Sequence, residues 1–273
     1  IGSRKSVNIP GVRINLPAIT ERDKKFIALS AKHNVDFIAH SFVRNAEDIK
    51  VVQEILDELG STIKIIAKIE NQEGVDNADE ILEAAYGIMI ARGDLGIEVA
   101  QEKIPGIQRV LIKKAIHHKK PVIVATQMLH SMIHNPRPTR AEITDIANAI
   151  YYRTDAVMLS GETAYGKYPV EAVRTMARTA YEAELTKLTD NDIRVPYDTY
   201  KEGDVTEFLA KQAVKTSNKL SVKAIVTDSH TGRTARVLAA FRGKSPISAI
   251  TTTKRLAREL ALSYGIMAEF QEG

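Results

Sequence analysis

Five short apolar runs rich in β-branched residues recur between residues 35 and 159, and each leads into a segment with helix-like spacing. The runs are Val35–Ala39, Ile63–Ala67, Gly87–Ala91, Pro121–Ala125 and Asp155–Leu159. Apart from Asp36 and Asp155 they are apolar throughout rather than alternating, so both faces of the sheet that they form must be covered. This is typical of parallel strands joined by helices. The repeat predicts an α/β fold, and the polar groups of interest fall directly after its strands.

Boundary residues predict where the intervening helices begin and end. Thr20 and Asn45 are N-cap residues, and Gly60 ends a helix. The expected helices cover residues 21–33, Ala46–Leu59, Val75–Ala84, Lys103–His118, Arg140–Tyr152 and Pro169–Lys187. Residues 1–20 are expected to form strands and turns that lead into the first of them.

A change of composition at residues 188–203 predicts a linker, because Thr, Asp, Asn, Pro and Gly are frequent there. A second and smaller α/β unit is expected beyond it. Its helices are Val205–Lys219, Ala235–Phe241 and Lys254–Ser263, and its strands are Lys223–Thr227, Ile247–Thr251 and Ile266–Phe270.

Composition narrows the classes of function. The 273 residues carry a net charge of +4, spread without a Lys/Arg block, which argues against a nucleic-acid-binding stripe. The absence of cysteine excludes disulfides and thiolate metal sites and fits a reducing compartment. No apolar run approaches the roughly 20 residues of a membrane span, and the first residues do not read as a signal peptide. We expect a cytoplasmic protein without nucleic-acid or membrane partners.

Lys68, Glu70 and Asp94 stand at the ends of two neighbouring strands. In a parallel β/α protein, the carboxyl ends of the strands carry the active site. Lys68 and Glu70 are alternate residues, so they share a face if the strand extends that far. One ammonium and two carboxylates at one rim suit a divalent metal and a phosphorylated anion. The other interpretation is that both acids are ordinary solvated loop residues.

Other candidates at strand ends are weaker. The turn Gly93-Asp94-Leu95-Gly96 enters a short helix whose free N–H groups could bind a carboxylate or phosphate. Thr126 and Ser160 are hydroxyls that suit substrate binding or proton relay, or serve as simple N-caps. His40 is interpreted as making local hydrogen bonds rather than binding metal.

A second candidate site lies in the smaller unit, between a strand and a helix. Ser229, Thr231, Gly232, Arg233 and Thr234 place hydroxyls, a glycine and a guanidinium at a helix start. This combination suits a phosphate, but an ordinary hydroxyl-capped helix would have a similar sequence.

Several of these segments, taken in order, strongly resemble the pyruvate kinase family. The resemblance covers essentially the whole chain and is carried by residues 68–74 (KIENQEG), 91–98 (ARGDLGIE), 125–129 (ATQML), 135–142 (NPRPTRAE) and 158–164 (MLSGETA). It implies part of a (β/α)₈ barrel, about five of its eight units, over residues 16–188. It also implies a linker at 189–203 and part of a C-terminal α/β domain over 204–273. Residues 1–15 would then be the end of an inserted β-domain.

The resemblance also implies phosphoryl transfer from phosphoenolpyruvate to ADP, giving pyruvate and ATP, with Mg²⁺ (or Mn²⁺) and K⁺. By motif, Glu70 and Asp94 would hold the Mg²⁺, and Lys68 would stabilise charge on the phosphoryl group and the enolate. The Gly93 and Asp94 amides would receive the substrate carboxylate, and Thr126 and Ser160 would lie near the protonation step. Thr231-Gly232-Arg233-Thr234 resembles a sugar-phosphate effector loop, and the family is usually tetrameric.

The same comparison implies that parts of the family's site lie outside this chain. The first three barrel strands, the K⁺ ligands and the lid over the nucleotide would be missing, so we expect two exposed sheet edges and an uncovered apolar interior. We therefore expect the isolated chain to be inactive. Two alternatives remain open: a Mg²⁺-dependent aldolase-type barrel acting on pyruvate enolate, and a non-catalytic fragment that binds an effector or mediates oligomer contacts.

Overall fold

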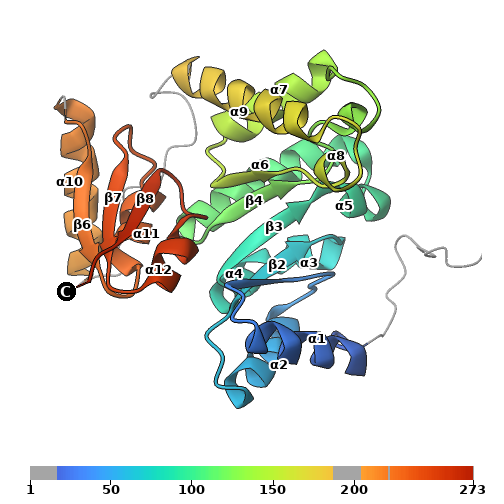
Figure 1. The fold of residues 1–273 in the computed structure, drawn as a ribbon, viewed down its shortest axis with the longest axis horizontal. Coiled ribbons are helices and arrows are strands. Elements are labelled where there is room, and N and C mark those ends of the chain that lie inside the picture. The colour runs from blue at the N-terminus through green and yellow to red at the C-terminus, as the bar shows by residue number, and fades with distance from the viewer. Residues whose placement is uncertain (1–16, 187–203, 221, 273) are drawn as a thin grey trace, which may run out of the picture.

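The computed structural model describes residues 17–186, 204–220 and 222–272, which form two α/β units (Figure 1). The expectations for residues 1–15 and for the linker at 189–203 lie outside these ranges. No helix among the described residues is long and apolar enough to cross a membrane.

The larger unit is an open sheet of five parallel strands in sequence order, which confirms the partial barrel. Its strands are β1 (Phe37–His40), β2 (Lys64–Ile69), β3 (Gly87–Ala91), β4 (Val122–Ala125) and β5 (Ala156–Met158). The helices are α1 (Glu21–Lys32), α2 (Ala46–Glu58), α3 (Gln72–Asp76), α4 (Ala78–Ala84), α5 (Arg92–Glu98), α6 (Ile104–His117), α7 (Arg140–Tyr151), α8 (Gly161–Ala164) and α9 (Pro169–Thr186). Short 3-10 turns cover Gln101–Lys103 and His130–Ile133.

The smaller unit has three parallel strands in the order β6-β7-β8. Its elements are α10 (Val205–Lys219), β6 (Ile225–Ser229), α11 (Arg233–Ala240), β7 (Ile247–Thr251), α12 (Lys254–Leu260) and β8 (Ile266–Phe270). The first strand begins and ends two residues later than predicted, because Ser229 pairs with Thr251 of the neighbouring strand. Ser229 is therefore the buried last residue of β6 and not part of the loop.

The single helix predicted over residues 75–84 is in fact two helices, α3 and α4, which meet at Asn77. The side-chain amide of Asn77 donates a hydrogen bond to the Arg44 carbonyl (2.9 Å) in the loop after β1. Gly74 allows this close approach, because a Cβ there would lie 2.5 Å from the Val43 carbonyl oxygen. Contacts with the loop after β1 thus override the continuous helical pattern.

Side-chain alternation divides the five-stranded sheet into two apolar faces. The outer face carries Ile65, Ile69, Ile90 and Val124, and it packs in the main core with the helices. The inner face carries Ile66, Met89, Ile123 and Ala125, which are at most 8% exposed. The expectation of an uncovered apolar interior was wrong, because Phe37, Tyr86, Ala156, Met158 and Leu262 pack against these residues.

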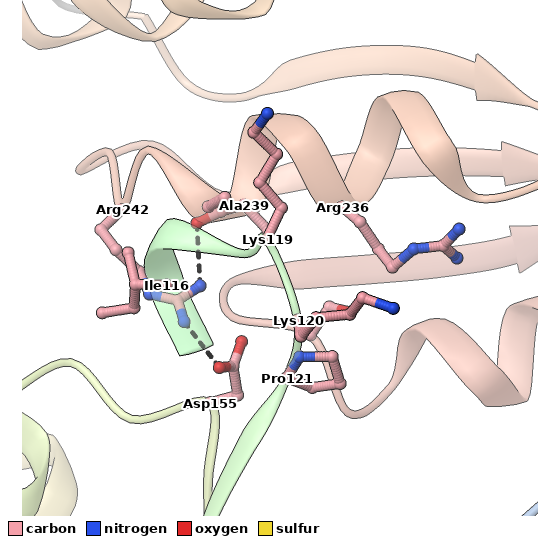
Figure 2. A pocket seen from close by; sticks show the side chains of 10 residues that line it. Ile116, Lys119, Lys120, Pro121, Asp155, Arg236, Ala239 and Arg242 are labelled. Atoms are coloured by element: carbon pink, nitrogen blue, oxygen red, sulfur yellow. Dashed lines mark hydrogen bonds and ion pairs between the residues drawn. The ribbon is translucent and has the colours of Figure 1, made fainter. Parts of the chain in front are cut away.

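The smaller unit packs against the amino-terminal edge of the larger sheet. Asp36, which precedes β1, makes a two-pronged ion pair with Arg258 (2.8 and 2.9 Å). Asp155, which precedes β5, pairs with Arg242 (2.6 Å) and accepts a hydrogen bond from Tyr264 N–H (2.8 Å). Figure 2 shows Asp155 and Arg242 facing each other beside the α6–β4 connection. The opposite edge, where the candidate site lies, is left clear of these contacts.

The segment between β4 and α7 is fixed by one carboxylate. Glu142 accepts hydrogen bonds from the backbone and hydroxyl of Ser131 (2.7 and 2.6 Å) and of Thr139 (2.7 and 2.9 Å). Burial opposes its ionisation, but these hydrogen bonds outweigh burial and lower the pKa of the Glu142 carboxyl. Glu142 therefore links the residues that precede and follow the Pro-rich turn at 135–138.

We predict that Asp155→Asn lowers the free energy of unfolding by about 3–5 kcal/mol, because it leaves the Arg242 guanidinium buried without a countercharge. The double variant Asp155→Asn/Arg242→Met should lose less than the sum of the two single variants. Urea denaturation measures both effects. Glu47→Gln removes one side of an exposed pair with Lys50 and should change stability by well under ~1 kcal/mol. Equal losses in the Asp155 and Glu47 variants would contradict the role assigned to the buried pair.

A second prediction concerns Glu142 and pH. A carboxyl with a lowered pKa in the folded state contributes stability above its ordinary pKa of roughly 4.3, and this is lost as pH falls through the lowered value. Glu142→Gln should cost about 1–3 kcal/mol at pH 7, and the gap to the parent protein should close on acidification. Denaturation curves at pH 7 and pH 3 test this, with the exposed Glu54→Gln as the control. A gap of unchanged size at the lower pH would contradict it.

Candidate functional site

Lys68 and Glu70 form an ion pair on the inner face of the sheet. β2 extends to Ile69, so Lys68 lies within the strand and Glu70 directly follows it. Lys68 Nζ lies 2.8 Å from Glu70 Oε1. Glu70 is fully buried, whereas about a quarter of the Lys68 side chain is exposed. The predicted shared face is therefore observed, and the pair stands at the carboxyl end of β2.

The loop after β1 holds both members of this pair. Ser41 Oγ accepts a hydrogen bond from Lys68 Nζ (3.0 Å), and Phe42 N–H donates to Glu70 Oε2 (2.7 Å). Phe42 has a φ of 53°, a left-handed conformation that is unfavourable for a bulky residue. Sequence reasoning missed these two residues, and the only signal was their position directly after a strand.

The donor set at this edge fits a divalent metal of the Mg²⁺ type. Glu70 Oε1 is buried and receives no hydrogen bond of ordinary geometry, although it faces the Lys68 ammonium. Asp94 is half-buried in the first turn of α5, after the neighbouring strand β3, and Ile69 pairs with Ile90 there. The described residues contain no group of three or more His, Cys, Asp or Glu side chains that could enclose a metal. Two carboxylates, completed by water and phosphate oxygens, are the usual protein share of a Mg²⁺ site.

His40 is not part of this donor set. It shares the outer face of β1 with Ile38, away from Lys68, and its Nε2 is buried without a hydrogen bond. This atom makes no hydrogen bond, and the expected local hydrogen bonding of His40 is with the Asp48 backbone. Burial is the main cause that lowers the pKa of His40, so the imidazole is kept neutral.

Thr126 and Gly93 bring the ends of β4 and β3 together. Gly93 N–H donates to Thr126 Oγ1 (2.7 Å), so the two residues predicted to bind substrate are in direct contact. Thr126 and the following Gln127 both have positive φ, 65° and 55°. Two consecutive left-handed non-glycine residues are strained, and such strain persists only where neighbouring interactions hold it.

Arg92, which directly follows β3, makes some of the interactions that hold this strained backbone. Its guanidinium is buried, donates to the Thr126 carbonyl (2.7 Å) and is ion-paired with Asp145 of α7. It also approaches Met128 Sδ at 3.2 Å. The sequence around Arg92 gives no sign that this side chain turns inward, so its role is visible only in the structure. It acts here as the support of the Thr126 backbone.

Glu162 connects the loops after β4 and β5. It is 2% exposed, and it accepts hydrogen bonds from Leu129 N–H (3.1 Å) and Ser160 N–H (2.9 Å). Ser160 is therefore positioned through its backbone, with its side chain partly exposed. Among the described hydrogen bonds and ion pairs, none joins the Lys68–Glu70 pair directly to Asp94, Thr126 or Ser160. The candidates share one edge rather than a single network.

The loop predicted to bind a phosphate lies in the smaller unit. Gly232 has a φ of 77°, a left-handed conformation that explains the glycine. Arg233 starts the eight-residue helix α11, and its guanidinium pairs with Asp204 (2.6 Å). Thr231 Oγ1 accepts a weak hydrogen bond from Arg233 N–H (3.4 Å). Thr231 and Arg233 are exposed, but the Arg233 charge already has a partner.

Comparison with known proteins covers both units. A family model for the barrel domain of pyruvate kinase matches residues 1–173, and one for the pyruvate kinase alpha/beta domain matches residues 207–272. The chain is 52% identical over 268 residues to a pyruvate kinase of Borreliella burgdorferi, and 50% identical over 265 residues to one of Geobacillus stearothermophilus. Each match covers 97% of this chain, with 56% and 45% of the respective relative. The chain thus spans about half the length of the curated relatives that it matches, and it belongs to the pyruvate kinase family.

Proposed function

We propose that the protein containing this chain transfers the phosphoryl group of phosphoenolpyruvate to ADP, giving pyruvate and ATP, as a step of glycolysis. The observation that carries the proposal is the Lys68–Glu70 ion pair at the carboxyl end of β2. It lies at the same sheet edge as the contact between Gly93 and Thr126. The family membership of both units supports it.

In this proposal the inner-face charges act on the phosphoryl group. Glu70 and Asp94 hold Mg²⁺ (or Mn²⁺), which supplies positive charge to the phosphoryl and enolate oxygens. The P–O bond of phosphoenolpyruvate breaks, a terminal phosphate oxygen of ADP bonds to phosphorus, and the electron pair stays on the enolate oxygen. The Lys68 ammonium, held by Ser41 and Glu70, stabilises that charge without moving.

The residues after β3 and β4 act on the rest of the substrate. The Gly93 and Asp94 amides receive its carboxylate. Since Gly93 N–H now donates to Thr126 Oγ1, a carboxylate there either shares this N–H or displaces the hydroxyl. Thr126 then stands beside the enolate carbon, which gains a proton to give pyruvate, and Ser160 lies near the same step.

Several further features belong to the same proposal. K⁺ is a second cofactor, with its ligands outside these 273 residues. The protein is cytoplasmic and forms a homo-oligomer, with a tetramer as the family norm. The loop formed by Ser229, Thr231, Gly232, Arg233 and Thr234 takes a sugar-phosphate effector. Binding there requires Arg233 to turn from Asp204, its present partner.

The alternatives have less support. A Mg²⁺-dependent aldolase-type barrel would also use Glu70 and Asp94, but it has no need of Lys68 two residues before the metal ligand. A non-catalytic fragment that binds an effector or mediates oligomer contacts would leave the buried Glu70 carboxylate unexplained.

We predict that phosphoenolpyruvate with Mg²⁺ raises the melting temperature of the chain. At a ligand concentration of 100 times the Kd, the free energy of unfolding should rise by about 2.7 kcal/mol. Glu70→Gln should abolish binding of Mn²⁺, followed by electron paramagnetic resonance, because it removes a ligand charge. Lys68→Met should keep Mn²⁺ binding and weaken that of phosphoenolpyruvate. Glu83 and Lys113 are exposed, and the variants Glu83→Gln and Lys113→Met are the matched controls. Stabilisation by a sugar phosphate alone, with no response to phosphoenolpyruvate, would favour the non-catalytic alternative.

We also predict that the isolated 273-residue chain gives no measurable turnover in a pyruvate-coupled assay with Mg²⁺ and K⁺. The described sheet is open at β1 and β5, so its residues reach a substrate from one side only. Normal turnover would contradict this.

In an active full-length protein, Lys68→Met should lower kcat by about 10²-fold or more, and an unchanged kcat would remove Lys68 from the mechanism.

A further inference from the structure

A small cavity, here called the inter-unit cavity, lies where the smaller unit packs against the amino-terminal edge of the larger sheet (Figure 2). Its volume is about 10 Å³, which is roughly the space that one water molecule needs. The lining includes residues of both units, among them Lys119, Lys120, Pro121, Arg236, Arg242 and Ser263. The cavity has room for a single water or a ligand of one atom, and it lies at the opposite end of the strands from the candidate site.

Two of the cations that line the inter-unit cavity are already neutralised. Lys119 Nζ lies 2.6 Å from Glu207 Oε2, and Glu207 is buried. The Arg242 guanidinium lies 2.6 Å from Asp155 Oδ2, and both of these side chains are buried. Each of these cations therefore has its own carboxylate and does not require a further anion.

The other two cations, Lys120 and Arg236, have no such carboxylate. Among the ion pairs of the described residues, none includes either side chain. Lys120 Nζ donates a hydrogen bond to the Ala85 carbonyl (2.8 Å). The Arg236 guanidinium lies over the Tyr86 ring and donates to the Thr231 carbonyl (3.2 Å). Two positive charges at the cavity are thus left without a countercharge, one from each unit.

Lys120 and Arg236 are close enough to repel each other. In Figure 2 both side chains extend to the same side of the α6–β4 connection. Burial is the main cause that lowers the pKa of the Lys120 ammonium, and the charge of Arg236 lowers it further. Like charges in a partly buried place cost free energy of folding unless an anion lies near both of them.

Ser263 adds a polar group that lacks a partner. The residue lines the same cavity and is 7% exposed. Its Oγ is buried and has no hydrogen-bond partner among the described residues. Buried hydroxyls are almost always hydrogen-bonded, so something in the cavity is expected to accept this hydrogen. A water molecule would satisfy the hydroxyl, but it would leave the two positive charges uncompensated.

We propose that the inter-unit cavity binds one small monovalent anion of the size of chloride. Lys120 attracts it from the larger unit and Arg236 from the smaller one, while the Ser263 hydroxyl donates a hydrogen bond to it. The apolar side chains of Pro121 and Ala239 form part of the wall. The size of the cavity excludes phosphate and larger anions. The bound anion holds the smaller unit against the larger sheet, and this role does not depend on the proposed catalytic function.

Thermal unfolding of the chain in sodium chloride and in sodium gluconate of equal ionic strength tests the proposal, because gluconate is too large for the cavity. We expect a melting temperature about 2–4 °C higher in chloride at ten times its Kd, and the difference should saturate with concentration. It should vanish in Lys120→Gln/Arg236→Gln and shrink in Ser263→Ala. Lys215 is exposed on α10, and the control variant Lys215→Gln should keep the full difference.

Crystals grown in sodium bromide identify the ligand, because bromide replaces chloride and scatters anomalously. One bromide should lie in the inter-unit cavity of the parent protein and be absent from the double variant. Water alone in that cavity, at a bromide concentration that saturates the thermal effect, would overturn the proposal. So would equal melting temperatures of the parent in the two salts, or a chloride effect of the same size in the parent and the double variant. Stabilisation by phosphate that matches that by chloride and requires the same two cations would show that the ligand class is wrong.

Discussion

The buried carboxylate of Glu70 is the constraint on which the candidate site depends. A buried carboxylate needs a countercharge or hydrogen-bond donors, and Glu70 obtains them from its own strand and from the loop after β1. Lys68 provides the charge because strand alternation places it on the same face. Phe42 provides an N–H at the cost of a left-handed backbone. The first two strands and one loop are thereby fixed relative to each other at the edge where substrate is proposed to bind.

The same principle, backbone shape held by buried polar groups, recurs around this edge. Arg92 supports the carbonyl of Thr126, and Glu162 joins the backbone of Leu129 to that of Ser160. Both supporting groups are buried, and Thr126 and Ser160, two of the residues that they support, are more accessible. The smaller unit makes its ion pairs at the other edge, through Asp36 and Asp155, so it stabilises the sheet without covering the site.

Sequence patterns predicted the strands and the shared face of Lys68 and Glu70, because both follow from local alternation. β3 and β7 have the predicted limits. Features that depend on distant contacts were not predictable. The division at Asn77 requires the Arg44 carbonyl, and the buried position of Ser229 requires its pairing with Thr251. The left-handed backbone of Phe42 could not be foreseen from a residue type that disfavours it. The proposed roles of Asp94, Thr126 and Ser160 come from the family resemblance.

The hydrogen bond from Gly93 N–H to Thr126 Oγ1 has a consequence for spectroscopy. The amide hydrogen of Gly93 lies at the rim of the site, yet its acceptor is a side chain from a different strand end. Its chemical shift and its rate of exchange with solvent therefore report whether that hydroxyl is in place. A ligand that engages either group changes this single resonance, and one that binds in the smaller unit leaves it alone. Gly93 thus offers a native probe of the candidate site that needs no label beyond ¹⁵N.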